Sequence, residues 1–173
     1  MKAGKILGGE SMYKIGIVTM SDKGARGERE DTSGAAIKEL VAGLGRVEQY
    51  RVVPDDPEVI KNTLIEFADQ HALDLILTTG GTGLGPRDNT PEATLAVIHR
   101  QAPGLAEAIR AESLKKTPKA MLSRAISGIR GKTLIINLPG SVKGVRECLE
   151  VVLPVLPHGL EILTGRGGEC GSG

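Results

Sequence analysis

The segment LDLILTTGGTGLGPRDNTPE, residues 73–92, constrains the fold of this chain more than any other part of it. Its first five residues are apolar except for Asp74, and helical patterns lie on both sides of them. This arrangement is typical of a central parallel strand that is covered on both faces. The carboxyl end of such a strand faces a ligand crevice in an open α/β sheet. The sequence therefore predicts a strand at 73–77 with a binding site directly after it.

The residues after this strand carry the signals of a phosphate site. Arg87 supplies a cation and Asp88 a potential Mg²⁺ ligand. Thr90 is predicted to be the N-cap of a helix, with Pro91 at its first position and Glu92 in its first turn. A plain strand-to-helix connection is the alternative, which the charged pair and the capping signal disfavour. The loop also holds glycines that allow positive φ angles and close approach to a ligand, so that consecutive N–H groups can converge on an anion: Gly80, Gly81, Gly83 and Gly85.

Apolar periodicity predicts strands and helices in alternation along most of the chain. The predicted strands are 13–20, about 47–53, 73–77 and 133–138. Three of the predicted helices are placed by their start: one begins after Asp31 or Thr32, one after Asp56 with Pro57, and one after Ser141. Three others are placed by their range, at about 91–100, 104–115 and 158–164. A polar loop is expected after the first strand, in the segment SDKGARGERED. Gly131 and Lys132 predict a tight hairpin between the apolar stretches 125–130 and 133–138.

These elements predict an α/β fold of three layers, α/β/α, with a mostly parallel central sheet. The chain has 173 residues, so a single domain is expected, and we place it at 12–164. The two ends, 1–11 and 165–173, are expected to be disordered, since glycines and polar residues dominate the tail.

Composition excludes several classes of function. The net charge is +1 and aromatic residues make up 2% of the chain with no Trp, so binding of nucleic acid is not expected. No stretch is long enough for a membrane span and the amino terminus lacks a secretory core, so a cytoplasmic location is expected. Cys148 and Cys170 lack CxxC spacing and are expected to be ordinary thiols. The histidines stand far apart and predict no metal site: His71, His99 and His158.

Carboxylates follow each of the first three predicted strands. Asp22 follows the first strand, Asp55 and Asp56 follow the second, and Asp88 lies in the loop after the third. Because the carboxyl ends of parallel strands share one edge, these side chains are expected to face one cleft. For Asp22 and Asp56 local capping or turn chemistry is the alternative, and it is the favoured one for Asp56. Carboxylates beside a phosphate loop would repel one another, which indicates Mg²⁺ with a nucleotide as the occupant.

Two further points of the sequence favour anion binding. In the run LPGS, Ser141 and the following N–H groups lie at a predicted helix N-terminus, and Lys143 adds positive charge. Ser123 with Arg124 offers another point, although Arg124 could also be a solvated charge at a helix end. Motifs of nucleophilic hydrolases, P-loop proteins and kinases are absent from the sequence. The sequence therefore favours direct in-line transfer of a phosphoryl or nucleotidyl group.

The pattern TTGG-TG-x-G-PRD-x-TPEA resembles the MoaB/Mog family of molybdenum-cofactor biosynthesis domains, to which the G domain of gephyrin belongs. The resemblance continues in SRAISGIRGKTLIINLPGS (123–141) and VVPDD (52–56), and it covers about residues 13–164. Relatives in longer chains share the glycine loop and lack PRD-x-TPEA, so the stand-alone branch fits better. Asn89, Val142 and Gly144 depart from common family residues and put the placement of the substrate in question.

The resemblance implies an Mg²⁺-dependent enzyme with ATP and molybdopterin as substrates. It would transfer AMP to the terminal phosphate of the pterin, release pyrophosphate, and prepare the pterin for molybdate insertion by a separate protein. Asp55 and Asp88 match the family's essential aspartates and are implied as catalytic residues and Mg²⁺ ligands. Substrate binding is implied for Ser21, Asp22, Thr79, Gly80, Gly81, Thr82, Gly83, Arg87, Ser123, Arg124, Asn137, Pro139, Gly140, Ser141 and Lys143.

Within this set, the resemblance places Ser123, Arg124, Ser141 and Lys143 on the pterin side, while the glycine loop holds phosphates of either substrate. It also implies a homotrimer and a possible handover of product to a molybdenum-insertion protein. Two alternatives stay open. One is a member that only binds the pterin or serves as a scaffold, and the other is a nucleotide-pyrophosphate hydrolase of the same fold.

Overall fold

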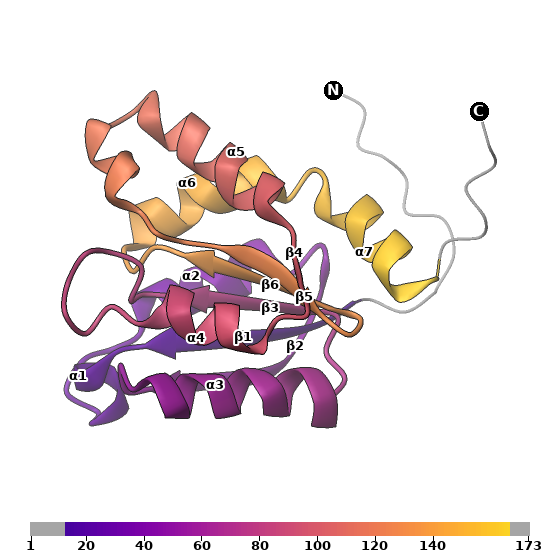
Figure 1. Ribbon diagram of the computed structural model, residues 1–173, viewed down its shortest axis with the longest axis horizontal. Helices are drawn as coiled ribbons and strands as arrows, with labels where there is room; N and C mark the ends of the chain where they lie inside the picture. Colours follow the sequence, from indigo (N-terminus) through magenta and orange to yellow (C-terminus); the bar gives the residue numbers. More distant parts are fainter. Residues whose placement is uncertain (1–12, 167–173) are drawn as a thin grey trace.

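The computed structural model describes residues 13–166. They fold around one six-stranded sheet (Figure 1). The strand order is β2-β1-β3-β6-β5-β4. The first four strands in this order are mutually parallel, whereas β5 pairs antiparallel with both β6 and β4. The strands are β1(Tyr13–Met20), β2(Gly45–Val53), β3(Leu75–Thr79), β4(Arg100–Gln101), β5(Ser127–Arg130) and β6(Thr133–Leu138). The mostly parallel α/β architecture and the predicted hairpin at Gly131 are thus confirmed.

Helices cover both faces of this sheet (Figure 1). The helices are α1(Asp22–Ala25), α2(Thr32–Leu40), α3(Pro57–Ile65), α4(Thr90–Val97), α5(Pro103–Leu114), α6(Val142–Val152) and α7(Leu156–Thr164). A π-helical turn, Glu66–Gln70, extends α3, and a 3-10 turn, Pro118–Leu122, follows α5. Helices α2, α5, α6 and α7 pack on one face, and α3 and α4 pack on the other. The predicted arrangement of three layers, α/β/α, is therefore confirmed.

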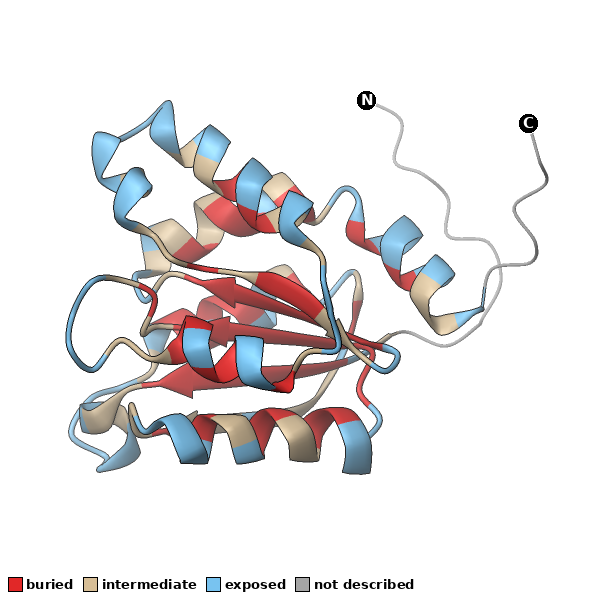
Figure 2. Cartoon of the chain, viewed as in Figure 1, coloured by how far each residue is buried: buried red, intermediate tan, exposed pale blue. Residues whose placement is uncertain are grey.

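Alternation along the central strands sends side chains into two separate cores. On β1, Ile15 and Ile17 belong to the core under α2, α5, α6 and α7, while Val18 belongs to the core under α3 and α4. On β3, Leu75 lies in the first core and Ile76 in the second. All five of these side chains are 0% exposed. The central strands are therefore buried on both sides (Figure 2), and their carboxyl ends are the part that can meet a ligand.

Several boundaries differ from the sequence prediction. The expected polar loop after β1 contains the short helix α1, because the Ser21 hydroxyl accepts from the Gly24 N–H at 2.9 Å and caps a turn there. Thr90 was predicted as an N-cap, which is wrong, since α4 begins with Thr90 and its hydroxyl donates to the Gly80 carbonyl. The helix also ends at Val97, before the unpredicted strand β4.

The folded domain extends two residues beyond the predicted boundary at 164. Gly165 ends α7 with a φ of 70°, and Arg166 forms a bidentate ion pair with the buried Asp74 at 3.0 and 3.1 Å. The expected disorder of 1–11 and of the rest of the tail concerns residues outside the described part. Within 13–166, no helix combines the length and the apolar character that crossing a membrane requires.

Candidate functional site

The candidate site lies at the carboxyl ends of the parallel strands. The chain leaves β1 for β2 on one side and returns through α3 to β3 on the other side, so the strand order reverses between β1 and β3. Ligands of open α/β sheets bind at such a switch point. Ser21 follows β1, Asp55 follows β2, and Gly80 follows β3, so the sequence motifs gather at this edge.

The glycine loop after β3 depends on backbone conformations that favour glycine. Gly80 has a φ of 94° and Gly81 a φ of 68°. A Cβ atom on Gly80 would also lie 2.6 Å from the Met20 carbonyl oxygen. The loop is closed on itself, because the Gly85 N–H donates to the Asp88 carboxylate at 2.9 Å and the Asp88 N–H donates to the Gly85 carbonyl at 3.0 Å.

Asp22, Asp55 and Arg87 form one connected cluster in front of the strands. The Asp22 N–H donates to Asp55 Oδ2 at 3.1 Å, and the Asp55 N–H donates to Asp22 Oδ1 at 3.0 Å. Arg87 reaches back from the glycine loop and donates from Nε and Nη2 to the two Asp22 oxygens at 2.7 and 2.9 Å. Asp22 and Asp55, two of the carboxylates expected at this edge, are therefore in contact with each other.

The electrostatics of the cluster separate its two aspartates. Hydrogen bonds from Arg87, and then from the Asp55 N–H, lower the pKa of the Asp22 carboxyl. Burial raises the pKa of Asp55, and the negative charges of Asp22 and Asp88 raise it further. The hydrogen bond from the Asp22 N–H and the positive charge of Arg87 oppose this rise. A further cation beside Asp55 would relieve the repulsion among the three carboxylates.

The donor set fits a Mg²⁺ ion only with help from a ligand. Among residues 13–166, no group of three or more His, Cys, Asp or Glu side chains is arranged to hold a metal ion. Asp55 and Asp88 each use Oδ2 as a hydrogen-bond acceptor for a backbone N–H, and no hydrogen bond from the described residues reaches the Oδ1 of either one. Two carboxylates completed by substrate phosphates and water are a common environment for Mg²⁺.

Arg124 braces the glycine loop. Its guanidinium donates from Nε to the Gly83 carbonyl at 2.8 Å and from Nη2 to the Asp88 carbonyl at 2.6 Å, and Nη1 pairs with Glu92. Its backbone N–H donates to the Thr82 carbonyl at 2.9 Å. The structure therefore ties this side chain to the loop that carries Asp88, whereas the family resemblance implied a place on the pterin side.

Asn137 and Thr79 lie inside the fold rather than on an open surface. The Asn137 amide is 1% exposed, and its two N–H groups donate to the hydroxyls of Thr78 and Thr94 at 3.0 Å. Its oxygen accepts from the Ile126 N–H at 3.2 Å. The Thr79 hydroxyl donates to the Pro139 carbonyl at 2.7 Å. Both residues thus hold the strand ends and loops around the site in place.

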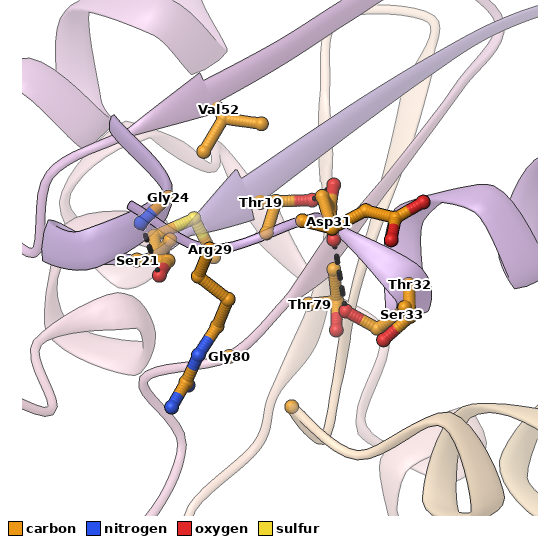
Figure 3. A pocket seen from close by; sticks show the side chains of 13 residues that line it. Thr19, Ser21, Gly24, Arg29, Asp31, Thr32, Ser33, Val52, Thr79 and Gly80 are labelled. Carbon is orange, nitrogen blue, oxygen red and sulfur yellow. Dashed lines mark hydrogen bonds between the residues drawn. The ribbon is translucent and has the colours of Figure 1, made fainter. Parts of the chain in front are cut away.

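A cavity of about 480 Å³ opens beside the ends of β1 and β3 (Figure 3). Four predicted residues contribute to it: Ser21, Thr79, Gly80 and Gly140. The remaining lining comes from Thr19, Met20, Gly24, Arg29, Glu30, Asp31, Thr32, Ser33 and Val52. The residues of the loop before α2 were not predicted to line a site, since their polarity alone indicated a solvated loop.

Asp31 organises the far wall of this cavity. Its carboxylate accepts from the hydroxyls of Thr19 at 2.6 Å and Ser33 at 3.1 Å, from the Gly34 N–H at 2.9 Å, and from the Tyr50 hydroxyl. Burial by itself would raise the pKa of Asp31, but these hydrogen bonds lower it, which keeps the carboxylate charged. The sequence left the cap of α2 open between Asp31 and Thr32, and the bond from the Gly34 N–H identifies Asp31 as the cap.

A second cavity, of about 300 Å³, lies on the other side of the Pro139–Ser141 turn between α5 and α6. Four of the predicted residues line it: Ser123, Asn137, Pro139 and Ser141. Arg110 and Lys119 add positive charge to its lining and were not predicted. Ser141 also caps α6 by accepting from the Gly144 N–H at 3.0 Å, as predicted. Lys143 is exposed and lines neither cavity.

The buried Cys148 also lines this second cavity. Burial raises the pKa of its thiol to about 11, so it is protonated near neutral pH. This agrees with its expected role as an ordinary thiol.

Comparison with known proteins connects these features to one family. The family model described as "Probable molybdopterin binding domain" matches residues 16–158. A molybdopterin adenylyltransferase of Helicobacter pylori is 46% identical over 154 residues, which cover 87% of this chain and 88% of that protein. A protein of the same name from Escherichia coli K12 is 40% identical over 154 residues, covering 85% and 79%.

A solved structure shows the same fold. The molybdopterin biosynthesis enzyme MoaB from Thermus thermophilus superimposes with a TM-score of 0.84 at 59% sequence identity, covering 89% of this chain and 98% of that one. The six-stranded sheet and its helices are therefore those of a MoaB structure.

Proposed function

Because this chain belongs to the family of probable molybdopterin-binding domains, we propose that it is a molybdopterin adenylyltransferase of molybdenum cofactor biosynthesis. In this reaction an oxygen of the terminal pterin phosphate attacks the α-phosphorus of ATP. The bond between that phosphorus and the oxygen bridging to the β-phosphate breaks, so the products are adenylylated molybdopterin and pyrophosphate. The names and the coverage of the curated relatives support this assignment.

The cluster of Asp22, Asp55 and Arg87 beside the glycine loop is the observation that carries the proposal. It combines carboxylates and a guanidinium at the switch point of the sheet. Groups of this kind can position a bound polyphosphate and balance its charge. The described site contains no Ser, Cys or Thr that is hydrogen-bonded to a histidine as a nucleophile would be. Direct transfer between the two substrates is consistent with that arrangement.

In this proposal Asp55 and Asp88 would hold Mg²⁺ through the oxygens to which no described residue donates a hydrogen bond. The ion would neutralise phosphate charge during the transfer. The chain's own contribution is to fix the two carboxylates, which it does through the Asp22 N–H and through the Gly85 N–H. Arg87 supplies positive charge to the cluster through its ion pair with Asp22.

In this proposal the two substrates occupy the two cavities, one on each side of the Pro139–Ser141 turn. We place the pterin side at the cavity of Ser123 and Ser141, with Lys143 near the N-terminus of α6, where the helix dipole favours a phosphate. Gly81, Thr82 and Gly83 of the loop lie between the phosphates of the two substrates in this arrangement. Arg124 contributes by holding that loop.

One assay separates this proposal from its alternatives: pyrophosphate release from MgATP, measured with and without molybdopterin. The proposal expects release only when the pterin is present. Release without the pterin would support a nucleotide-pyrophosphate hydrolase. A protein that binds the pterin and releases no pyrophosphate would support a pterin-binding or scaffold role.

We also propose a homotrimer that works in the cytoplasm and hands its product to a molybdenum-insertion protein. A single small domain gains buried apolar surface by closed symmetric assembly. Light scattering at micromolar concentration checks the first part, since a monomeric mass would contradict it.

A further inference from the structure

Asp22 occupies a central place in the candidate site, yet its contacts differ from those of a substrate ligand. It is the first residue of α1, and only Ser21 separates it from the carboxyl end of β1. Its side chain is 29% exposed, and both carboxylate oxygens accept hydrogen bonds from protein groups. The carboxylate is therefore engaged by the protein before any ligand is present.

The first of these contacts joins the ends of two neighbouring strands. Asp22 and Asp55 exchange their N–H groups, each donating to the carboxylate of the other at 3.1 and 3.0 Å. The Ser21 N–H adds a bond to the Val53 carbonyl at 2.9 Å. This ring fixes the backbone of Asp55 and one of its carboxylate oxygens. The other oxygen, Oδ1, lies 3.5 Å from the position of a Cβ atom on Gly81, so it faces the glycine loop.

The second contact fixes the glycine loop. Arg87 is 65 residues from Asp22 in sequence, and its guanidinium forms a two-bond fork with the carboxylate. The Arg87 side chain is 63% exposed, so screening by solvent leaves the pair little weight in overall stability. A planar two-bond fork still fixes direction. Its effect is to hold the segment next to Asp88 against the end of β1.

We propose that Asp22 is a positioning residue for adenylyl transfer, which holds Asp55 through the backbone and Arg87 through the fork without itself binding substrate or Mg²⁺. The inference rests on the proposed function. Asp22 acts through residues at the ends of β2 and β3, so its removal misaligns groups that face the phosphates. A misplacement of this kind lowers turnover far more than it lowers affinity.

Two substitutions divide the contacts of Asp22. Asp22→Asn keeps an oxygen for the Asp55 N–H and places an amide group against Arg87, so it breaks only the fork. Asp22→Ala removes the fork and also the oxygen that accepts from the Asp55 N–H, while the Asp22 backbone N–H can still donate to Asp55. The matched control is Asp69→Asn, because Asp69 forms the same kind of fork with Arg130 at 3.0 and 2.7 Å at the distant antiparallel edge.

Hydrogen exchange of the ligand-free proteins, read by mass spectrometry, tests the placement. In both Asp22 variants exchange at 85–88 should rise, and at Asp55 it should rise in Asp22→Ala. Asp69→Asn should change neither region. Unchanged exchange in Asp22→Ala would overturn the inference, whatever the activity.

Steady-state kinetics test the role in the reaction. For Asp22→Asn we expect kcat to fall about 10-fold or more, with KM for ATP and for molybdopterin within about 2-fold of the parent. Unchanged kcat would make Asp22 a structural residue only and overturn the inference. If Asp22→Asn needed about 10-fold more Mg²⁺ than the parent to reach half its maximal rate, Asp22 would be a metal ligand, and this too would overturn the inference. No turnover by the parent would instead refute the proposed function, and the exchange result would then decide the placement alone.

Discussion

Replacing Arg124 with Gln should weaken the attachment of the glycine loop to the rest of the fold and lower the stability of the protein. The substitution removes the two hydrogen bonds from the guanidinium to the Gly83 and Asp88 carbonyls, at 2.8 and 2.6 Å, and the pairing with Glu92. The Arg124 side chain is 35% exposed, so each bond to a carbonyl is worth about 1 kcal/mol after allowance for solvent. The pairing with the 57% exposed Glu92 adds about 0.5 kcal/mol or less.

The sum is a loss of about 2 kcal/mol in the free energy of unfolding, which corresponds to a drop of about 4 to 8 °C in Tm for a domain of this size. Glu92→Gln is the matched control, since it removes only the ion pair and should lower Tm by about 1 to 2 °C. Differential scanning calorimetry measures both. A Tm for Arg124→Gln no lower than that of Glu92→Gln would refute the idea that the loop carbonyls hold the guanidinium.

Three further predictions concern other parts of the fold. The two-bond pair with Arg51 lowers the pKa of Glu66 to about 2 from its usual 4.5. A lowered pKa stabilises the fold above pH 4.5 and this contribution is lost as the pH falls toward 2, so the stability difference between the parent and Glu66→Gln should shrink over that range in urea titrations. Among the described residues, Arg166→Ala leaves the 7% exposed Asp74 carboxylate with the Lys14 N–H as its one hydrogen-bond partner, and chemical denaturation should show a loss of about 2 to 3 kcal/mol. Lys143→Ala should weaken binding of molybdopterin by about 1 to 2 kcal/mol in calorimetric titration without changing Tm, and unchanged affinity would remove Lys143 from the pterin site.

Elements with strong local signals could be predicted from the sequence. The Asp56 cap with Pro57 fixes the start of α3, and the structure shows the expected bonds from the Glu58 and Val59 N–H groups to the Asp56 carboxylate. Ser141 caps α6 in the same way. In both cases the cap, the first turn and the apolar spacing lie within a few residues of one another, so a local pattern is sufficient.

Elements decided by distant partners could not be predicted. Thr90 carries the usual sequence of an N-cap, but its hydroxyl donates to the Gly80 carbonyl across the loop and the helix begins one position earlier. Asp31 was one of two candidate caps for α2, and its bonds to Thr19 and Tyr50, which connect three separate segments, were not expected. No spacing in the sequence encodes those contacts.

The same distinction applies to the candidate site. The rule that parallel strands end at one edge was enough to place Asp22 and Asp55 together. It could not show that Arg124 donates to backbone carbonyls of the loop. Nor could it show that the Asn137 amide group already donates to hydroxyls inside the fold. Residue type gives the chemistry a side chain can perform, and only the packing around it shows which groups remain available.

The central claim is that carboxylates at this edge serve nucleotidyl transfer, and Asp88→Asn tests it most directly. Asn keeps an oxygen for the Gly85 N–H, so the loop should remain folded while the charge is lost. Asp56→Asn is the matched control, because Asn replaces Asp as a helix cap with little cost and stands at the same edge.

The measurement is the rate of pyrophosphate release from MgATP in the presence of molybdopterin. The account predicts that Asp88→Asn lowers this rate by at least about 100-fold, with a Tm and a pterin affinity close to those of the parent, while Asp56→Asn keeps the parent rate. Release by Asp88→Asn at near the parent rate would contradict the account and leave Asp88 as a residue that only closes the turn with Gly85.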